Sequence, residues 1–336
     1  MNILITGITG MVGSHLAEYL LAEHPECAIH GLIRWRSPRD NILGILDRVT
    51  LHQGDLRDLN SLIELMRAVR PDRIFHLAAQ SYVDQSFRAP ADTLHTNVIG
   101  TTNLLDAVRI CGLTPRIHIC SSSEVYGQVR EDELPIRESN VMRPASPYAV
   151  SKVGEDMVAL QYGLSYGMHI LRTRMFTHTG PRRGDVFAES AFAKQIAEIE
   201  AGVRQGPVKV GNLDSVRTIA DVRDTVRAYW LLLEHCPAGE VYNIGGNEVA
   251  TVGEILEMLK AMANVPIAHE VDPARLRPSD VTLQVPSIEK FQQATGWEPV
   301  IPMRQTLSDL LDYHRERIAA QVPTTLPRSA PLCKVA

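Results

Sequence analysis

Residues 2–16 read NILITGITGMVGSHL, and this stretch decides the fold. An apolar run typical of a buried strand leads into a turn with three glycines, and a helical pattern follows the last of them. Glycines at these positions let the turn tighten, so that the backbone can approach a pyrophosphate at the positive end of the helix. The stretch therefore predicts the first strand, turn and helix of a dinucleotide-binding unit. The residues of the predicted cofactor turn are Gly7, Thr9, Gly10, Met11, Val12 and Gly13.

Outward from this turn, short apolar runs alternate with amphipathic helical patterns as far as Gly180. This alternation of strands and helices predicts an α/β fold with a Rossmann-type, doubly wound parallel sheet. We expect strands at Ile3–Thr6, Ala28–Ile33, Val49–His52, Arg73–His76, Arg116–Ser121 and His169–Arg174. We expect helices at Met11–Glu23, Leu59–Val69, Val98–Cys111 and Tyr148–Tyr166.

Beyond Gly180 the pattern becomes that of a smaller mixed α/β lobe. We expect helices at Phe187–Ala201 and Asp221–His235, short strands near Val208 and Val216, a strand at Glu240–Ile244 and a helix that opens with a Thr251/Glu254 capping box. Residues 1–180 would form the cofactor-binding domain, which also carries the catalytic residues, and residues 181–320 would form the substrate lobe, with the chain crossing between them. Residues 321–336 contain three prolines and no apolar periodicity, which predicts a disordered tail.

Bulk composition excludes several classes of function. The formal net charge of −5 gives no cationic surface of the kind that nucleic-acid-binding proteins use. No apolar run reaches membrane-spanning length, which predicts a protein without membrane contact. The five cysteines are scattered and include no Cys-x-x-Cys pair, so we expect reduced thiols, no metal site and a cytoplasmic location.

Strand ends indicate which dinucleotide would bind. After the second strand the chain supplies Arg34 and Arg36, with no acid before Asp40 to bind the ribose hydroxyls of NAD. Arginine suits a 2′-phosphate, which favours NADP over NAD, and NAD is the alternative. The ends of the third and fourth strands would line the same crevice with Asp55, Leu56, Leu77, Ala78 and Ala79.

A tyrosine and a lysine suggest acid–base chemistry. Tyr148 and Lys152 lie four residues apart, so they share one face of a helix. An ammonium at ~4 Å could lower the pKa of a tyrosine from ~10 toward ~7 at an effective dielectric constant of ~20. Tyr148 would then serve as a general base for a sugar hydroxyl. The polar stretch from Ser121 to Glu124 leaves the fifth strand at the same sheet edge, which adds to the prediction of an oxidoreductase.

Together these motifs resemble a known superfamily. The three turn glycines, Asn97, Tyr148 and Lys152 are similar to those of extended short-chain dehydrogenases/reductases across nearly the whole chain. Within that superfamily, residues 121–124, 181–187, 211–217 and 276–280 resemble GDP-mannose 4,6-dehydratases and GDP-4-keto-6-deoxymannose reductases.

The resemblance implies roles for individual residues. Ser122 would bind the sugar 4-hydroxyl, Glu124 would take the C5 proton, and Tyr148 with Lys152 would be the oxidation pair. Lys194, Arg217 and Arg277 would contact the GDP diphosphate and ribose, which fixed cations suit. Thr177 stands where both relatives usually have asparagine. The implied substrate-binding residues are Ser81, Ser123, Thr177, Arg183, Lys194, Arg217 and Arg277.

Several reactions remain open at this point. Residues 181–187 resemble the dehydratase, and residues 265–299 lack an insertion typical of dehydratases and resemble the reductase. The first hypothesis is a 4,6-dehydratase acting on GDP-mannose, the second an NADPH-dependent reductase of a 4-keto sugar, and the third a 4-epimerase, which would not need Glu124. A noncatalytic NADP-sensing scaffold is a different class, although it would not need the Ser122, Tyr148 and Lys152 groups.

The resemblance also implies an assembly. In the family, the helices that correspond to Val98–Cys111 and Tyr148–Tyr166 pair with their symmetry mates as a four-helix bundle. We therefore expect a homodimer, or a homotetramer in which the Arg34–Asn41 loop bridges to a neighbour.

Overall fold

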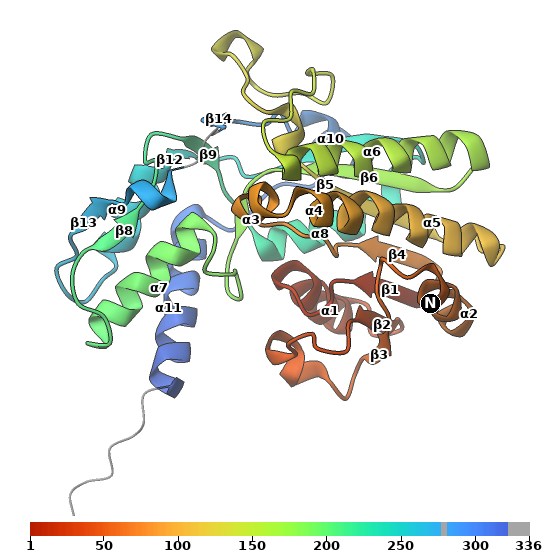
Figure 1. The fold of residues 1–336 in the computed structure, drawn as a ribbon, viewed down its shortest axis with the longest axis horizontal. Coiled ribbons are helices and arrows are strands. Elements are labelled where there is room, and N and C mark those ends of the chain that lie inside the picture. The colour runs from red at the N-terminus through yellow and green to blue at the C-terminus, as the bar shows by residue number, and fades with distance from the viewer. Residues whose placement is uncertain (277–280, 322–336) are drawn as a thin grey trace, which may run out of the picture.

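A seven-stranded parallel sheet forms the centre of the molecule in this computed structural model, which describes residues 1–276 and 281–321 (Figure 1). The strand order is β11-β6-β5-β4-β1-β2-β3, and every neighbouring pair runs parallel. The predicted fold class is confirmed. The strands are β1 (Asn2–Thr6), β2 (Ala28–Ile33), β3 (Thr50–Gln53), β4 (Arg73–His76), β5 (Arg116–Ser122), β6 (Ile170–Met175) and β11 (Val241–Ile244).

Helices cover both faces of this sheet because the strand residues alternate between two hydrophobic cores. Ile3 and Ile5 of β1 face one core, which includes α1 (Met11–Glu23), α8 (Val222–His235) and α10 (Glu289–Thr295). Leu4 of β1 faces the other core. That core includes α2 (Leu59–Val69), α5 (Gly100–Ile110) and α6 (Pro147–Tyr166).

One helix differs from the prediction. The segment expected as Val98–Cys111 is helical from Pro90, and it runs through α4 (Pro90–Leu94) and the π-helical turn η2 (His95–Ile99) into α5. Proline is favoured at the first helical position, where its missing N–H costs nothing. A further short helix, α3 (Val83–Arg88), precedes it. Strands β3 and β6 each lie one residue later than expected.

The second lobe has its own core, in which α7 (Ala188–Glu200) packs against α9 (Val252–Ala261) and α11 (Met303–Gln321), away from the sheet (Figure 1). Helix α9 begins with the predicted capping box: Thr251 Oγ1 accepts from Glu254 N at 3.0 Å, and Glu254 Oε2 accepts from Thr251 N at 2.7 Å. Helix α11 was not predicted. The short strands are β7 (His178–Thr179), β8 (Val208–Val210), β9 (Val216–Thr218), β10 (Ala220–Asp221), β12 (Val249–Thr251), β13 (His269–Val271) and β14 (Leu283–Gln284).

The chain returns from the second lobe to the sheet. After α7, β8 and β9, the helix α8 packs on α1, and β11 pairs with β6 as the edge strand. Later, α10 and the fully buried Trp297 join the same core. Segments beyond Gly180 therefore complete the N-terminal sheet. The predicted tail, residues 321–336, lies outside the described residues apart from Gln321.

Within residues 1–276 and 281–321, no helix is both long enough and apolar enough to cross a membrane.

Candidate active site

A cleft of about 1160 Å³ opens at the carboxyl ends of the sheet strands and is closed on its other side by α7, β9 and α9. This edge of an open parallel sheet is where ligands bind in such folds. Most of the predicted site residues meet there, whereas Arg36 and Lys194 do not line the cleft and Arg277 lies outside the described residues. The predicted residues that line it are Gly7, Thr9, Gly10, Met11, Val12, Gly13, Arg34, Asp55, Leu56, Leu77, Ala78, Ala79, Ser81, Ser122, Ser123, Glu124, Tyr148, Lys152, Thr177, Arg183 and Arg217.

The glycine turn fits a dinucleotide because it admits no side chain. Gly7 has a φ of +75°, and a Cβ there would lie 2.9 Å from the amide nitrogen of Ala78. A Cβ on Gly13 would lie 2.2 Å from the carbonyl oxygen of Gly7. Gly10 caps α1 without a side-chain hydrogen bond. The positive end of the helix is thus left for an anionic ligand.

The end of the cleft next to β2 is lined by one of the two predicted arginines. Arg34 lines it, and its amide donates to Ser37 Oγ at 3.1 Å. The Arg36 guanidinium instead lies 4.1 Å from the ring centre of the exposed Trp35. Asn41 also lines the cleft, and its side chain donates to a carbonyl of the glycine turn at 2.9 Å. Ser37 and Asn41 were missed by the sequence analysis, although both lie in the stretch that follows Arg34.

Asp55 lies at the same end of the cleft, after β3, and has a charged partner. It forms an ion pair with Arg57 at 3.1 Å. Burial would raise the pKa of Asp55, but the hydrogen bonds and charge of Arg57 outweigh it and hold that pKa below its usual value.

Helix α6 carries the tyrosine and the lysine into the cleft. It begins at Pro147, and the hydroxyl of Ser146 caps it by accepting from Ala149 N at 3.0 Å. Burial raises the pKa of Tyr148 above its usual value, and the opposing effects of Lys152 and of a hydrogen bond with Ser122 are smaller. The lowering toward ~7 that we expected from Lys152 alone is therefore not reached by the charges of the protein itself.

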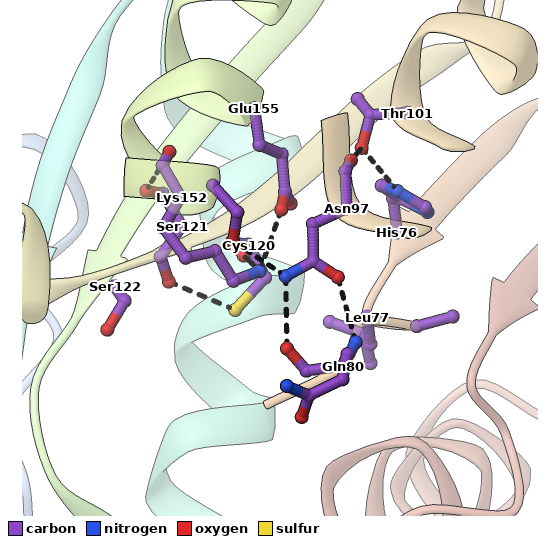
Figure 2. A network of polar contacts seen from close by, with 12 residues as sticks. His76, Leu77, Gln80, Asn97, Thr101, Cys120, Ser121, Ser122, Lys152 and Glu155 are labelled. Atoms are coloured by element: carbon purple, nitrogen blue, oxygen red, sulfur yellow. Dashed lines mark hydrogen bonds and ion pairs between the residues drawn. The ribbon is translucent and has the colours of Figure 1, made fainter. Parts of the chain in front are cut away.

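Lys152 is held from two sides. Its Nζ donates to the carbonyl of Cys120 at 2.8 Å and to Glu155 Oε2 at 2.9 Å (Figure 2). Burial alone would lower the pKa of Lys152, but the negative charge of Glu155 raises it above its usual value. The ammonium therefore remains charged. Glu155 was not foreseen, although its spacing of three residues from Lys152 was a readable signal.

The end of β5 positions a serine and a glutamate side by side. Ser122 is the cap of the 3₁₀ turn η3 (Ser123–Tyr126), and its Oγ accepts from Glu124 N at 3.2 Å. Ser122, Glu124 and Tyr148 all line the cleft. The hydroxyl of Ser122, the carboxyl of Glu124 and the phenol of Tyr148 can therefore contact one substrate in the cleft.

Ser123 has a different partner. Its Oγ donates to Gln284 Oε1 at 2.8 Å, and both residues are buried at the cleft wall. The Nε2 of Gln284 is buried without a hydrogen-bond partner among the described residues. Gln284 is therefore a candidate substrate contact that the sequence analysis missed.

Asn97 joins three parts of the site. It lies in the π-helical turn η2, and its Nδ2 donates to Gln80 O at 3.0 Å and to Ser151 Oγ at 2.8 Å. Its Oδ1 accepts from Gln80 N at 2.8 Å (Figure 2). The loop after β4 is thereby fixed against α6.

The predicted cations of the second lobe lie in different environments. Arg183 is largely buried in the cleft, with its guanidinium 3.5 Å from the ring centre of Phe187, and burial lowers its pKa. Lys194 pairs with Asp185. Arg217 donates to two backbone carbonyls, those of Val216 and Val281. Thr177 lines the cleft just before β7.

Known proteins match this chain over nearly its whole length. A family model described as GDP-mannose 4,6 dehydratase matches residues 4–310. The chain belongs to the GDP-mannose 4,6-dehydratase family. It is 36% identical to the GDP-6-deoxy-D-mannose reductase of Pseudomonas aeruginosa, in a match that covers 94% of this chain and 98% of the reductase. It is 33% identical to the GDP-mannose 4,6-dehydratase of Yersinia enterocolitica, with 92% of each chain covered.

A solved structure supports the same family. The structure of RMD from Pseudomonas aeruginosa complexed with NADPH matches with a TM-score of 0.83 at 35% identity, over 94% of this chain and 99% of that one. The resemblance inferred from the glycine turn and the Tyr148/Lys152 pair is therefore confirmed. These relatives are named for two different reactions: one is called a reductase and the other a dehydratase.

Proposed function

We propose that this chain is an NADP-dependent nucleotide-sugar 4,6-dehydratase that converts GDP-mannose to GDP-4-keto-6-deoxymannose. The observation that carries the proposal is the carboxyl group of Glu124, which lines the cleft on the same edge as Ser122 and Tyr148. Elimination of water across C5 and C6 needs a base for a carbon-bound proton, and neither ketone reduction nor 4-epimerisation needs one there.

Different residues of the chain would carry out the separate proton transfers of this reaction. Tyr148 would take the proton of the sugar 4-hydroxyl while Ser122 holds the same oxygen by a hydrogen bond. Glu124 would remove the C5 proton and pass a proton to the leaving C6 hydroxyl, which departs as water. Once hydride has been returned to C6, C5 would take up a proton that comes from solvent. A bound NADP would supply the redox step by accepting hydrogen from C4 and returning it to C6, so none is consumed overall.

The proposed cofactor is NADP, with NAD as the alternative. The glycine turn and the uncapped end of α1 suit the pyrophosphate, and Arg34 with Ser37 suits a 2′-phosphate. Lys152, whose side chain lines the cleft, would hold the nicotinamide ribose. The proposed nucleotide-sugar contacts of the second lobe are Arg183 and Arg217.

The second candidate is an NADPH-dependent reductase of a GDP-4-keto-6-deoxy sugar. It is favoured by the 36% identity to the Pseudomonas aeruginosa reductase over 98% of that chain. In that reaction Tyr148 would donate its proton to the 4-keto oxygen, which agrees with a tyrosine whose pKa burial raises.

We also propose a homodimer or homotetramer, because α6 exposes an apolar stripe, formed by Val150, Met157 and Leu164, that a second copy would cover. A cytoplasmic location remains a prediction from the scattered cysteines.

The decisive experiment supplies GDP-mannose and a catalytic amount of NADP⁺ in deuterated water. A dehydratase gives a 4-keto-6-deoxy product with solvent deuterium at C5, which mass spectrometry and NMR would detect. If GDP-mannose is left unchanged and NADPH is oxidised stoichiometrically with a 4-keto sugar, the dehydratase assignment is wrong and the reductase replaces it. Formation of a 4-epimer would reject both.

A further inference from the structure

The lysine of the site has a buried partner to which the proposed mechanism gives no role. Glu155 lies one turn after Lys152 on α6 and accepts a hydrogen bond from its Nζ at 2.9 Å. Only 1% of the Glu155 side chain and 6% of the Lys152 side chain are exposed. Glu155 is not among the residues that line the cleft. The carboxyl group therefore lies beneath the site, where it contacts the lysine but does not reach the cleft.

Stability alone is a weak reason for such a pair. Taking a carboxylate and an ammonium out of water costs free energy that their attraction need not return, and apolar residues of similar size often serve stability as well. Lys152, however, must remain charged beside Tyr148. A second negative group close to Lys152 then changes both where the ammonium sits and how strongly its charge acts on the tyrosine.

Other charges near the pair are already balanced or neutral. Asp156, the next residue on α6, is held by Arg172 at 2.6 Å and Arg174 at 2.8 Å from β6. Burial lowers the pKa of His76 on β4 and of His118 on β5 to about 3, so both are neutral. From η2 and α5, which pack on α6, Asn97 and Thr101 join the network and carry no charge (Figure 2). Among the described residues, the titratable groups that act on the Lys152–Glu155 pair are Asp156, Tyr148, Cys120, His76 and His118, and the arginines Arg172 and Arg174 face Asp156.

We infer that Glu155 is a positioning residue for the Tyr148–Lys152 pair. Its carboxyl group fixes the ammonium of Lys152 against the carbonyl of Cys120, and when ionised it offsets part of the positive charge that Tyr148 experiences. The inference rests on the proposed function in one respect, namely that Tyr148 is the acid–base group.

The direction of the effect follows from charge. Burial raises the pKa of Glu155 to about 7, although the nearby ammonium opposes it, so the group can change its charge near neutral pH. A negative charge raises the pKa of every neighbouring acid, and its removal lowers the pKa values of Tyr148 and of Lys152 alike. Removing the charge of Glu155 should therefore move the limb of the pH profile that Tyr148 sets to lower pH, at pH values where Glu155 of the wild type is ionised.

The test compares wild type with Glu155→Gln, Glu155→Asp and Glu64→Gln. Glu155→Gln keeps the shape of the side chain without its charge, and we expect the limb of the turnover profile that Tyr148 sets to move to lower pH by about one unit. Glu155→Asp keeps the charge but falls short of the lysine, so turnover should drop several-fold with the profile in place. Glu64→Gln removes the same charge from an exposed position on α2 and should change nothing. An unmoved profile for Glu155→Gln, or wild-type turnover for Glu155→Asp, would overturn the inference.

A second readout needs neither substrate nor cofactor. The near-ultraviolet absorbance of tyrosinate is followed against pH, and the same titration of a Tyr148→Phe variant isolates the contribution of Tyr148. In the Glu155→Gln protein this contribution should appear at lower pH than in wild type, and equal titration midpoints would refute the proposed charge effect. If wild type turns over none of the proposed substrates, the proposed function fails while this titration still decides the role of Glu155. Should Glu155→Gln unfold, turnover of the Glu155→Asp protein decides the positioning role.

Discussion

At the scale of single residues, Glu124 separates the two candidate reactions. Replacing it by glutamine keeps the hydrogen-bonding shape but removes the base, so dehydratase turnover should fall by about 10²- to 10⁴-fold. Binding of NADP(H), measured by fluorescence titration, should remain. Glu131→Gln is the matched control, because this exposed glutamate starts another 3₁₀ turn and does not line the cleft. Full turnover in the Glu124→Gln enzyme would show that the elimination uses another base.

The two arginines that follow β2 should differ in their contribution to the preference for NADP(H) over NAD(H). Arg34 lines the cleft beside Ser37, whereas Arg36 stacks on Trp35 outside it. Arg34→Ala should therefore weaken binding of NADP(H) relative to NAD(H) about tenfold or more, as expected for the loss of one charged hydrogen bond. Arg36→Ala should leave the ratio nearly unchanged. Calorimetric titration with both dinucleotides measures the ratio, and an equal loss in the two variants would contradict this assignment.

The sequence could predict which residues gather at the site better than it could predict their partners. The polar residues after β5 were foreseen, but regular alternation of strand side chains stops at Ser122, where η3 begins. The sequence could therefore not tell that Ser123 turns to Gln284. Gln284 comes 161 residues later in a two-residue strand that carries no motif. Glu155 could have been found, since residues three apart share a helix face.

At the scale of elements, α6 exposes a regular apolar stripe. Val150, Met157 and Leu164 are seven residues apart, and 46%, 37% and 78% of their surfaces are exposed. A spacing of seven keeps side chains on one seam of a helix, as in helix pairs that pack lengthwise. The stripe is the surface that a second copy would cover in the proposed assembly.

A charge in that stripe should separate the copies. Met157→Glu should reduce the mass measured by light scattering to that of one chain, 37.3 kDa, because a lone carboxylate is costly in an apolar interface. Val300→Glu, which places the same charge on another exposed apolar residue, should leave the mass of wild type. A single-chain mass for the wild-type protein would reject the assembly itself.

Elements with strong local patterns were predicted nearly to the residue, and elements that depend on tertiary contacts were not. The apolar spacing and capping signals of α1 and α2 gave their ends correctly. The π turn η2 was missed because Asn97 is held there by distant partners, Gln80 and Ser151. Helix α11 was missed because its few buried apolar residues form a narrow stripe that becomes apparent through tertiary contacts, mainly those with α7 and α9.

At the scale of the whole molecule, buried neutral histidines make stability depend on pH. Burial lowers the pKa to about 3 for His76 and His118 and to about 4 for His178 and His314. The pKa values of these histidines in the folded protein lie below the unfolded value of ~6.5. The unfolded chain therefore binds protons first as the pH falls below ~6.5, so the free energy of unfolding is highest above that pH and decreases toward about pH 4. Glu155 has the opposite effect: its pKa is raised in the folded protein, so its protonation at lower pH increases the free energy of unfolding.

The free energy of unfolding should therefore fall as the pH drops below 6.5, with about 1.4 kcal/mol per pH unit contributed by each histidine that stays neutral in the folded protein. Urea denaturation at several pH values measures this slope. His314→Gln should reduce this slope by the contribution of one proton, about 1.4 kcal/mol per pH unit. His235→Gln, at the exposed end of α8, is the matched control and should leave the slope unchanged. A stability that stays constant between pH 6.5 and 5 would contradict the burial of neutral histidines.

The return of the chain to the sheet limits how the molecule can be divided. Strand β11 covers β6, all six residues of which are buried. A polypeptide cut after Gly180 would expose β6 as a bare sheet edge, which invites pairing between molecules and aggregation. An engineer who wishes to exchange substrate lobes between relatives must therefore leave α8, β11 and α10 with the recipient sheet and join the donor chain at each crossing.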